Sequence, residues 1–208
     1  MTMSTVMIIR IPDIRLSREH CNVLLKNVLD LNNSHAHLCH AVDTPETYIY
    51  LADVLDSTMK QEPAKKEQPK ATSAVRAIGT LADAIAQQYP GASTDLLQLT
   101  LDLRGQAWDK TAVCHYVVET DVDGAAEGDF NDWYTQEHMP GLAAVPGTVR
   151  AMRLYSRDGA PRYHALYLLQ TQDTFGSPPW LAVRGTEWSS RVRPHFKNTK
   201  RTMFNIIE

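Results

Sequence analysis

The 208-residue sequence predicts an α+β fold made of two successive units of the same kind. Short β-branched runs alternate in polarity as strands do, and longer segments carry apolar residues at helical spacing. These segments follow the order β-α-β-β-α-β twice, each time over about 100 residues, which is the ferredoxin-like pattern. We therefore expect tandem ferredoxin-like units at 1–108 and 109–208, joined near "GQAWDK".

The first unit opens with the β-branched run "TVMIIRIPD", which is typical of a strand. Ser17 can cap the amphipathic helix that follows it. Two alternating segments around "DTPE" then predict a hairpin, and the polar, Lys-rich stretch Asp56–Ser73 predicts an exposed loop. A helix in "AVRAIGTLADAIAQQYPG" and a strand in "DLLQLTLDLRG" complete this unit, and we expect the Lys-rich loop to be its most mobile part.

The second unit repeats the order with little residue identity to the first. "AVCHYVVETDV" is a predicted strand, and Asp129 is the expected cap of the helix "FNDWYTQEH". "TVRAMRLYSR" and "RYHALYLLQT" form a predicted hairpin around "DGAP". Ser177 followed by Pro178 is a favourable helix start, and "RTMFNII" is the predicted last strand.

Composition and charge narrow the class of partner. A net charge of -3 argues against a nucleic-acid or anionic-lipid surface, and the apolar run at the N-terminus is too short for a membrane span. Three widely spaced cysteines favour a reducing compartment, so we expect a cytoplasmic protein. The bare face of each open sheet must be buried, by the other half of the chain or by a second copy, and a cavity enclosed in this way favours a small-molecule ligand.

One short stretch, from Phe130 to Tyr155, carries the residues that suggest chemistry. On a helix Phe130, Tyr134 and His138 share a face, with Trp133 beside them. Met139 precedes a proline, which should end the helix at His138, and the helix C-terminus should raise the pKa of its imidazole. The alternative is a histidine that caps its own helix beside an aromatic core.

The strand "TVRAMRLY" should place Arg153 and Tyr155 on one face, together with Val149 and Ala151. An arginine and a tyrosine facing a cavity could hold a carboxylate, enolate or phenolate. Alternatively, Arg153 forms a salt bridge at a rim and Tyr155 packs. The sequence leaves open which face of this strand points inward.

The segment from about 115 to 207 resembles the EthD-like family of the dimeric α+β barrel superfamily. The resemblance rests on "FNDWYTQEHMPGL", "VPGTVRAMRLY", "PRYHALYLL", "SPPW", "TEWSSR" and "RTMFNII". It implies a barrel formed by packing of the antiparallel sheets, a homodimer, and His138 as the acid–base residue. The first unit lacks the W-Y-x-x-x-H-x-P pattern and should complete the shell without a second active site.

Cofactor motifs are few. His35, His37 and Cys39 would share one face of a strand and could bind a metal, but polar residues on an exposed strand are the favoured explanation. No dinucleotide, phosphate-loop, serine-hydrolase or zincin motif occurs. We therefore expect neither a bound cofactor nor a metal.

These observations favour a cofactor-independent lyase, isomerase or cyclase acting on a small aromatic, lactone or polyketide-like acid. His138 would move a proton, Tyr155 or Arg153 would stabilise negative charge, and Trp133, Tyr134 and Phe130 would bind the substrate. The alternatives are an oxidative protein, either haem-binding or a cofactor-free monooxygenase, and a non-catalytic carrier of small molecules.

Overall fold

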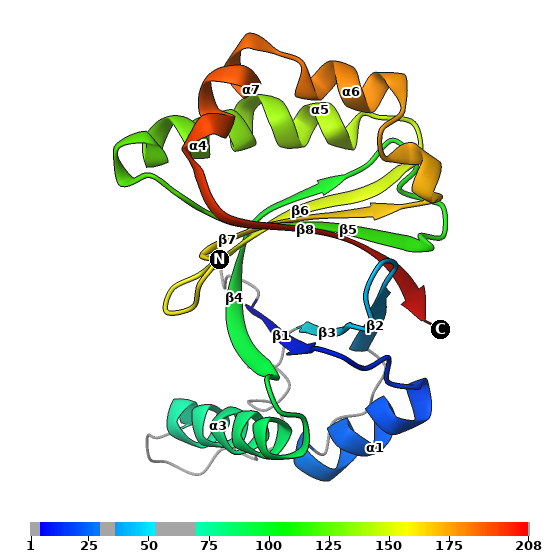
Figure 1. Cartoon of the computed structure of the whole chain (residues 1–208), viewed down its shortest axis with the longest axis vertical. Helices are drawn as coiled ribbons and strands as arrows, with labels where there is room; N and C mark the ends of the chain where they lie inside the picture. The colour runs from blue at the N-terminus through cyan, green and yellow to red at the C-terminus, as the bar shows by residue number, and fades with distance from the viewer. Residues whose placement is uncertain (1–4, 30–35, 53–69, 208) are drawn as a thin grey trace. The chain divides into compact units, whose positions relative to one another are not determined.

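The computed structural model describes residues 5–29, 36–52 and 70–207 (Figure 1). By its internal contacts the chain divides into two compact units, Met1–Leu97 with Ile207–Glu208, and Gln98–Ile206. The domain boundary expected at 108/109 stays a prediction.

The first unit has the predicted order of elements. They are β1 (Thr5–Ile11), α1 (Arg18–Leu29), β2 (Ala36–Ala41), β3 (Thr47–Ala52), α3 (Lys70–Gln88) and the start of β4 (Ser93–Arg104). β3 pairs antiparallel with β2, as the hairpin prediction required, and also with β1. The backbone N–H of His20 donates to Ser17 Oγ at 3.2 Å, which confirms Ser17 as the cap of α1.

The Lys-rich stretch differs in part from its prediction. Helix α3 already begins at Lys70, so 70–73 are helical rather than loop. Lysine and alanine are good helix formers, and here they extend the apolar helix toward its N-terminus. The remainder of this stretch, and with it the mobility expected there, lies outside the described residues.

The second unit also has the predicted order. Its main elements are β5 (Cys114–Val122), α4 (Glu127–Trp133), the π-helical turn η3 (Tyr134–His138), α5 (Met139–Ala143), β6 (Thr148–Ser156), β7 (Tyr163–Leu169), α6 (Pro178–Arg184), α7 (Glu187–Val192) and β8 (Phe196–Ile207). Three short 3₁₀ turns lie between them: η2 (Gly124–Ala126), η4 (Gln172–Thr174) and η5 (Arg193–His195). The strands are ordered β8-β5-β7-β6 with β4 beyond β6, and the helices lie on one face of this sheet (Figure 1). The predicted α+β fold of tandem ferredoxin-like units is confirmed.

Alternation along the strands builds the core between this sheet and its helices. Tyr116 and Val118 of β5, Ala151 of β6, and Ala165 and Tyr167 of β7 all belong to one buried cluster with the helices. The turn before β6 depends on a glycine. Gly147 has φ +92°, and a Cβ there would lie 2.3 Å from Thr174 Oγ1, so no other residue fits without a shift.

Two predicted helix caps differ in the structure. Helix α4 starts at Glu127, so Asp129 lies within its first turn and its carboxylate instead accepts hydrogen bonds from Trp188 and Arg191 of α7. A carboxylate in a first turn is still favoured by the helix dipole. Ser177 does precede α6, but its side chain makes no capping hydrogen bond, and the favourable start comes from Pro178.

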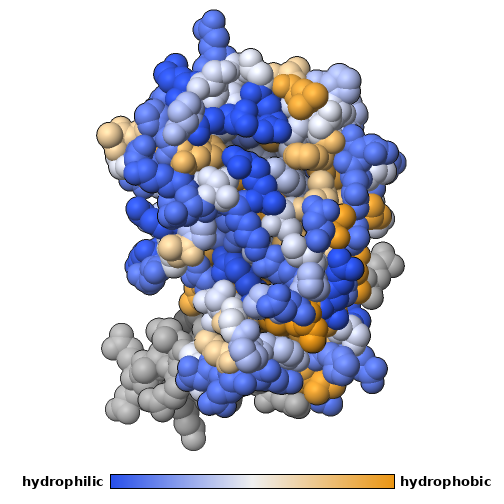
Figure 2. Space-filling model, in the orientation of Figure 1, coloured by the Kyte–Doolittle hydropathy of each residue, from blue (hydrophilic) through white to orange (hydrophobic). Residues whose placement is uncertain are grey.

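Hydrophilic side chains predominate over the described part of the surface in Figure 2, and hydrophobic ones form separate spots. The large hydrophobic side chains that are exposed are Ile14, Val23, Trp108, Val113 and Leu181. Scattered residues of this kind are normal for a folded domain. Across the described ranges, none of the helices combines the length and apolar character needed to cross a bilayer.

Candidate functional site

The helix that carries His138 does not end where the sequence predicted. α4 passes into the π turn η3, and α5 continues through Pro140. The backbone N–H of Met139 donates to the carbonyl of Tyr134, an i→i+5 bond that leaves Pro140 in the first turn of α5, where its missing N–H costs little. Met139 keeps helical angles before the proline (φ -66°, ψ -46°), and its fully buried Sδ accepts a hydrogen bond from Tyr167 at 3.1 Å.

The π turn brings Trp133 and His138 together. An α-helix, with 3.6 residues per turn, separates residues five apart around its axis, whereas a π turn places them nearly above one another. The two rings stack with centroids 4.1 Å apart and planes 22° apart. Tyr134 meets the imidazole edge-on, with centroids 5.4 Å apart.

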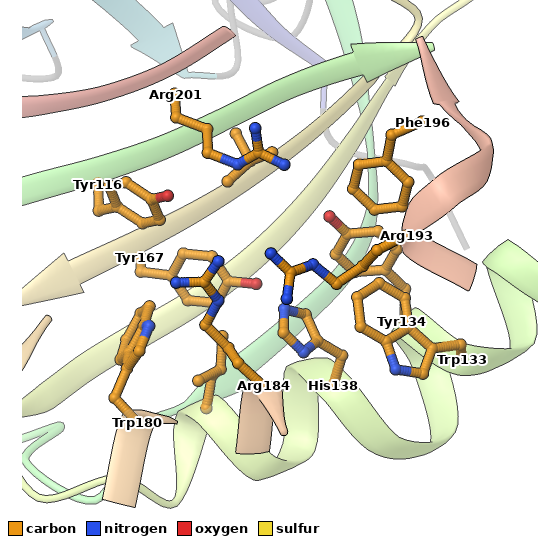
Figure 3. A pocket seen from close by; sticks show the side chains of 12 residues that line it. Tyr116, Trp133, Tyr134, His138, Tyr167, Trp180, Arg184, Arg193, Phe196 and Arg201 are labelled. Carbon is orange, nitrogen blue, oxygen red and sulfur yellow. The ribbon is translucent and has the colours of Figure 1, made fainter. Parts of the chain in front are cut away.

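A narrow pocket opens beside this stack, between the helices and the sheet of the second unit (Figure 3). It is lined by Tyr116, Val118, Trp133, Tyr134, His138, Leu142, Tyr167, Trp180, Arg184, Arg193, Phe196 and Arg201. The space between these atoms, including open solvent at the mouth, is about 360 Å³. All of these residues belong to the second unit, and the pocket is walled mainly by aromatic rings.

The protonation state of His138 corrects the sequence prediction. Burial, together with the smaller effects of the nearby Arg184, Arg193 and Arg153, lowers the pKa of His138 to about 3. The predicted rise was wrong because the helix continues past His138, so no helix terminus faces the imidazole. The imidazole is therefore neutral at physiological pH, and its buried Nδ1 has no hydrogen-bond partner.

This shift predicts a pH dependence of stability. The pKa of His138 is near 6.5 in the unfolded chain and lower in the folded one. As the pH falls below about 6.5, the unfolded chain binds a proton that the folded chain does not, so stability decreases toward acid and is constant above that range. We expect the melting temperature of the wild type to fall more between pH 7.5 and 4.5 (about the range in which histidine titrates) than that of His138→Phe. An equal fall of the melting temperature in the wild type and in His138→Phe would contradict the lowered pKa of His138.

The other predicted site residues do not line this pocket but lie next to it. Phe130 is fully buried and packs edge-on against Tyr134, with ring centroids 4.9 Å apart. Arg153 faces the helices from β6, with its guanidinium carbon 4.4 Å from the centroid of the Tyr134 ring and Nη2 2.7 Å from Asn131 Oδ1. Tyr155 faces the same side but lines a wider hollow, together with Arg153, and its hydroxyl accepts a hydrogen bond from Arg162 at 2.5 Å. The structure thus groups Trp133, Tyr134 and His138 around one pocket and leaves Tyr155 beside it.

A carboxylate fixes the outer edge of Trp133. Glu137 Oε1 accepts hydrogen bonds from Trp133 Nε1 at 3.1 Å and from Thr186 Oγ1 at 2.6 Å. Thr186 also caps α7, because its Oγ1 accepts the backbone N–H of Ser189 at 3.1 Å. This link ties the π turn to α7 and holds the indole plane against His138.

Removing the Thr186 hydroxyl should loosen that link. We expect Thr186→Ala to lower the free energy of unfolding by about 1–2 kcal/mol, the usual effect of losing an N-cap. Thr186→Ser keeps the hydroxyl and serves as the control in urea unfolding. Equal losses in both variants would assign the effect to the methyl group instead.

Comparison with solved structures places the fold. A protein from Fusobacterium nucleatum subsp. nucleatum ATCC 25586 that carries a monooxygenase assignment aligns over 99% of this chain and 93% of its own, with TM-score 0.62 and 9% identity. A protein assigned as a chlorite dismutase aligns over 100% and 96%, with TM-score 0.58 and 11% identity, and an anthrone oxidase-like protein over 100% and 92%, with TM-score 0.55 and 13% identity. The chain shares their fold.

At 9–13% identity these likenesses show a shared fold alone. No family model matches the chain, and no curated protein matches its sequence. Membership of the EthD-like family therefore stays a prediction. The chemistry therefore has to be argued from the residues of the site.

Sequence reasoning identified only three of the twelve residues that line the pocket, Trp133, Tyr134 and His138. Arg184 ends α6, Arg193 begins η5 and Arg201 lies on β8, so no local motif joins them. Trp180 was quoted only as part of a family block, and Tyr116 and Tyr167 only within strands. Tyr116 and Tyr167 each lie two residues from other core residues on their strands. This alternation was the sequence signal that could have placed both tyrosines on the buried face.

The possible metal site on β2 gains no support. His35 lies outside the described residues, and of the other two His37 is exposed and Cys39 is buried. Over the ranges that the structure covers, no three His, Cys, Asp or Glu side chains are arranged to hold a metal ion.

Proposed function

We propose that the chain is an oxidative enzyme that acts on a small aromatic or enolisable acid, with His138 as its acid–base residue. One observation carries the proposal: a neutral imidazole with a free Nδ1 lies buried at the wall of an aromatic pocket. A neutral imidazole can accept a proton, and a flat substrate can lie against the surrounding rings. Likeness to proteins with monooxygenase and oxidase names favours oxidation over lyase or isomerase chemistry.

The pocket suits a carbanion better than a neutral molecule. The positive charges of Arg184, Arg193 and Arg153 disfavour an imidazolium in the empty pocket. When a substrate loses a proton to His138, its new negative charge offsets that repulsion and the arginines stabilise the anion. Proton transfer and anion stabilisation thus act together.

Oxidation of an activated methylene group illustrates the expected reaction. His138 accepts one proton from the methylene, and the delocalised anion gives electrons to O₂. One oxygen atom becomes the product carbonyl and the other leaves as water with the two methylene hydrogens, so that R₂CH₂ and O₂ give R₂C=O and H₂O.

Haem fits this pocket poorly. A porphyrin would require the buried rings of Trp133, Tyr134 and Tyr167 to move apart. A single aromatic ring requires only that Arg184, Arg193 and Arg201 turn, and these side chains are half-buried or exposed at the mouth. Long exposed side chains reorient within nanoseconds.

Arg153 and Tyr155 keep supporting roles in the proposal. Arg153 holds the Tyr134 ring and adds positive potential behind it. Tyr155 would contact the part of a longer substrate that reaches the neighbouring hollow. The homodimer expected from the family resemblance also stays a prediction, which light scattering of the purified protein tests directly.

Oxygen uptake tests the proposal. Purified protein, without added cofactor, is supplied with anthrone or with the smaller enolisable lactone 2-coumaranone, and O₂ consumption is followed with an electrode above the uncatalysed rate. Enzyme-dependent uptake for either compound supports oxidation. Conversion that proceeds equally without O₂ would favour an isomerase or lyase, and binding without conversion would favour a carrier.

A further inference from the structure

Three arginines face the pocket without a carboxylate partner. Arg184, Arg193 and Arg201 come from α6, η5 and β8, and their guanidinium groups point toward the space above His138 (Figure 3). Within the described part of the chain they form no ion pair, and the pocket lining contains no acidic residue. Like charges gathered in this way repel one another, which an anion between them would relieve.

Some other arginines of the same unit are paired. Arg150 binds Asp102 at 2.6 Å, Arg191 binds Asp129 at 2.9 Å, and Arg162 lies 3.6 Å from Glu127. Among the described residues, Arg104, Arg153 and Arg157 of this unit form no ion pair either, and Arg104 and Arg153 lie over the rings of Trp108 and Tyr134. The pocket differs in that three such arginines line the same space.

The three charges act on one another and on the pocket. Burial lowers the pKa of Arg193, and Arg184 and Arg201 lower it further, so all three lie within electrostatic reach. They also oppose the burial-driven rise in the pKa of the Tyr116 hydroxyl. The positive potential therefore reaches from the mouth to the wall formed by β5.

We propose that Arg184, Arg193 and Arg201 bind the carboxylate of an aromatic acid whose ring lies against Tyr116, Tyr167 and Trp180. The fork of a guanidinium matches a planar carboxylate, and most of the other lining residues are aromatic. The inference rests on the proposed function, since it names the substrate class for the same pocket.

Binding of benzoate tests this site separately from turnover. Isothermal titration with benzoate and with its neutral isostere benzamide compares ligands that differ chiefly in charge. We expect benzoate to bind about 10- to 100-fold more tightly, the range given by one or two charge-assisted hydrogen bonds. Equal affinities would overturn the inference, and so would inorganic phosphate binding more tightly than benzoate.

Variants locate the site. Arg184→Gln and Arg193→Gln should each weaken benzoate binding about 10-fold or more. Arg191→Gln removes the same charge from the same unit, but its side chain is 59% exposed and paired with Asp129, so it should bind benzoate as the wild type does. If Arg191→Gln weakened benzoate binding as much as the other two variants do, the loss would come from the change in net charge, and the proposed site would be wrong.

A second readout places the ligand beside His138. Bound benzoate should raise the pKa of the imidazole, followed by NMR, because the carboxylate offsets the nearby arginines. An unchanged His138 titration, with benzoate bound, would place the ligand elsewhere. If benzoate binds but no compound causes O₂ uptake, the proposed function is wrong and this inference stands. If O₂ uptake occurs only with neutral substrates, the proposed function stands and this inference is wrong.

Discussion

His138→Ala should lower the turnover of the oxygen-consuming reaction by about 10²–10⁴-fold, the usual contribution of a general acid–base residue. The imidazole is neutral at physiological pH, and its buried Nδ1 has no hydrogen-bond partner. The Trp180 indole nitrogen is also buried without a partner, but an indole N–H only donates, so it cannot accept a proton as His138 can. Stopped-flow or electrode assays under saturating O₂ give the rate. Near-wild-type turnover in a folded variant would remove His138 from the mechanism.

Stability must be separated from chemistry, because His138 is 8% exposed and stacks on Trp133. Alanine would leave a gap beside the indole, whereas His138→Phe keeps an aromatic ring and lacks both nitrogens. We expect the two variants to lose activity alike and to differ in melting temperature. His195→Ala, on an exposed histidine outside the pocket lining, is the matched control for a general loss of histidine.

Trp133→Ala should have the largest effect on stability, about 3–5 kcal/mol of the free energy of unfolding. The indole is 1% exposed, stacks on His138, meets Tyr134 at 4.7 Å between ring centroids, and donates its N–H to Glu137. A loss of this size is a large part of the 5–15 kcal/mol that typically holds a domain folded. Urea unfolding followed by circular dichroism measures it.

Two control variants separate the effects of the hydrogen bond and of burial on this loss of stability. Trp133→Phe keeps a ring against His138 but loses the hydrogen bond to Glu137, so it should cost about 1–2 kcal/mol. Trp108→Ala makes the same exchange at a side chain that is 57% exposed, and should change stability by about 0.5 kcal/mol or less. If Trp108→Ala were as harmful as Trp133→Ala, burial would not explain the loss.

The sequence predicted the fold because strand alternation and helix periodicity are local. The same alternation placed Arg153 and Tyr155 on one face of β6, and the structure shows that this face looks toward the helices. Which face that is depends on the helices that cover the sheet, so it could not be read from β6 alone.

The chemistry of the site was predicted only in part. Trp133, Tyr134 and His138 are close in sequence and were identified together. The pKa of His138 could not be predicted, because the burial that lowers it depends on the tertiary fold. Two of the three arginines that also lower it, Arg184 and Arg193, lie on elements that begin 40 or more residues later in the chain. The π turn has no periodicity of its own, and the proline after Met139 suggested a helix end where the backbone bonds shift by one residue instead.

That π turn can also be described as one surplus residue within a helix. Phe130 and Trp133 before it and Met139 and Leu142 after it all face the core, so the turn takes up an extra residue without rotating either segment. Thr135 and Gln136, at its exposed side, are where a deletion would convert it to an ordinary α-helix with Trp133 and His138 four apart. A chain lacking Gln136 should therefore melt near the wild-type temperature, and a large fall would show that the surplus residue is required. If the variant folds in this way, the helix can lose one residue at this point and still keep the stacked rings of Trp133 and His138 at the pocket.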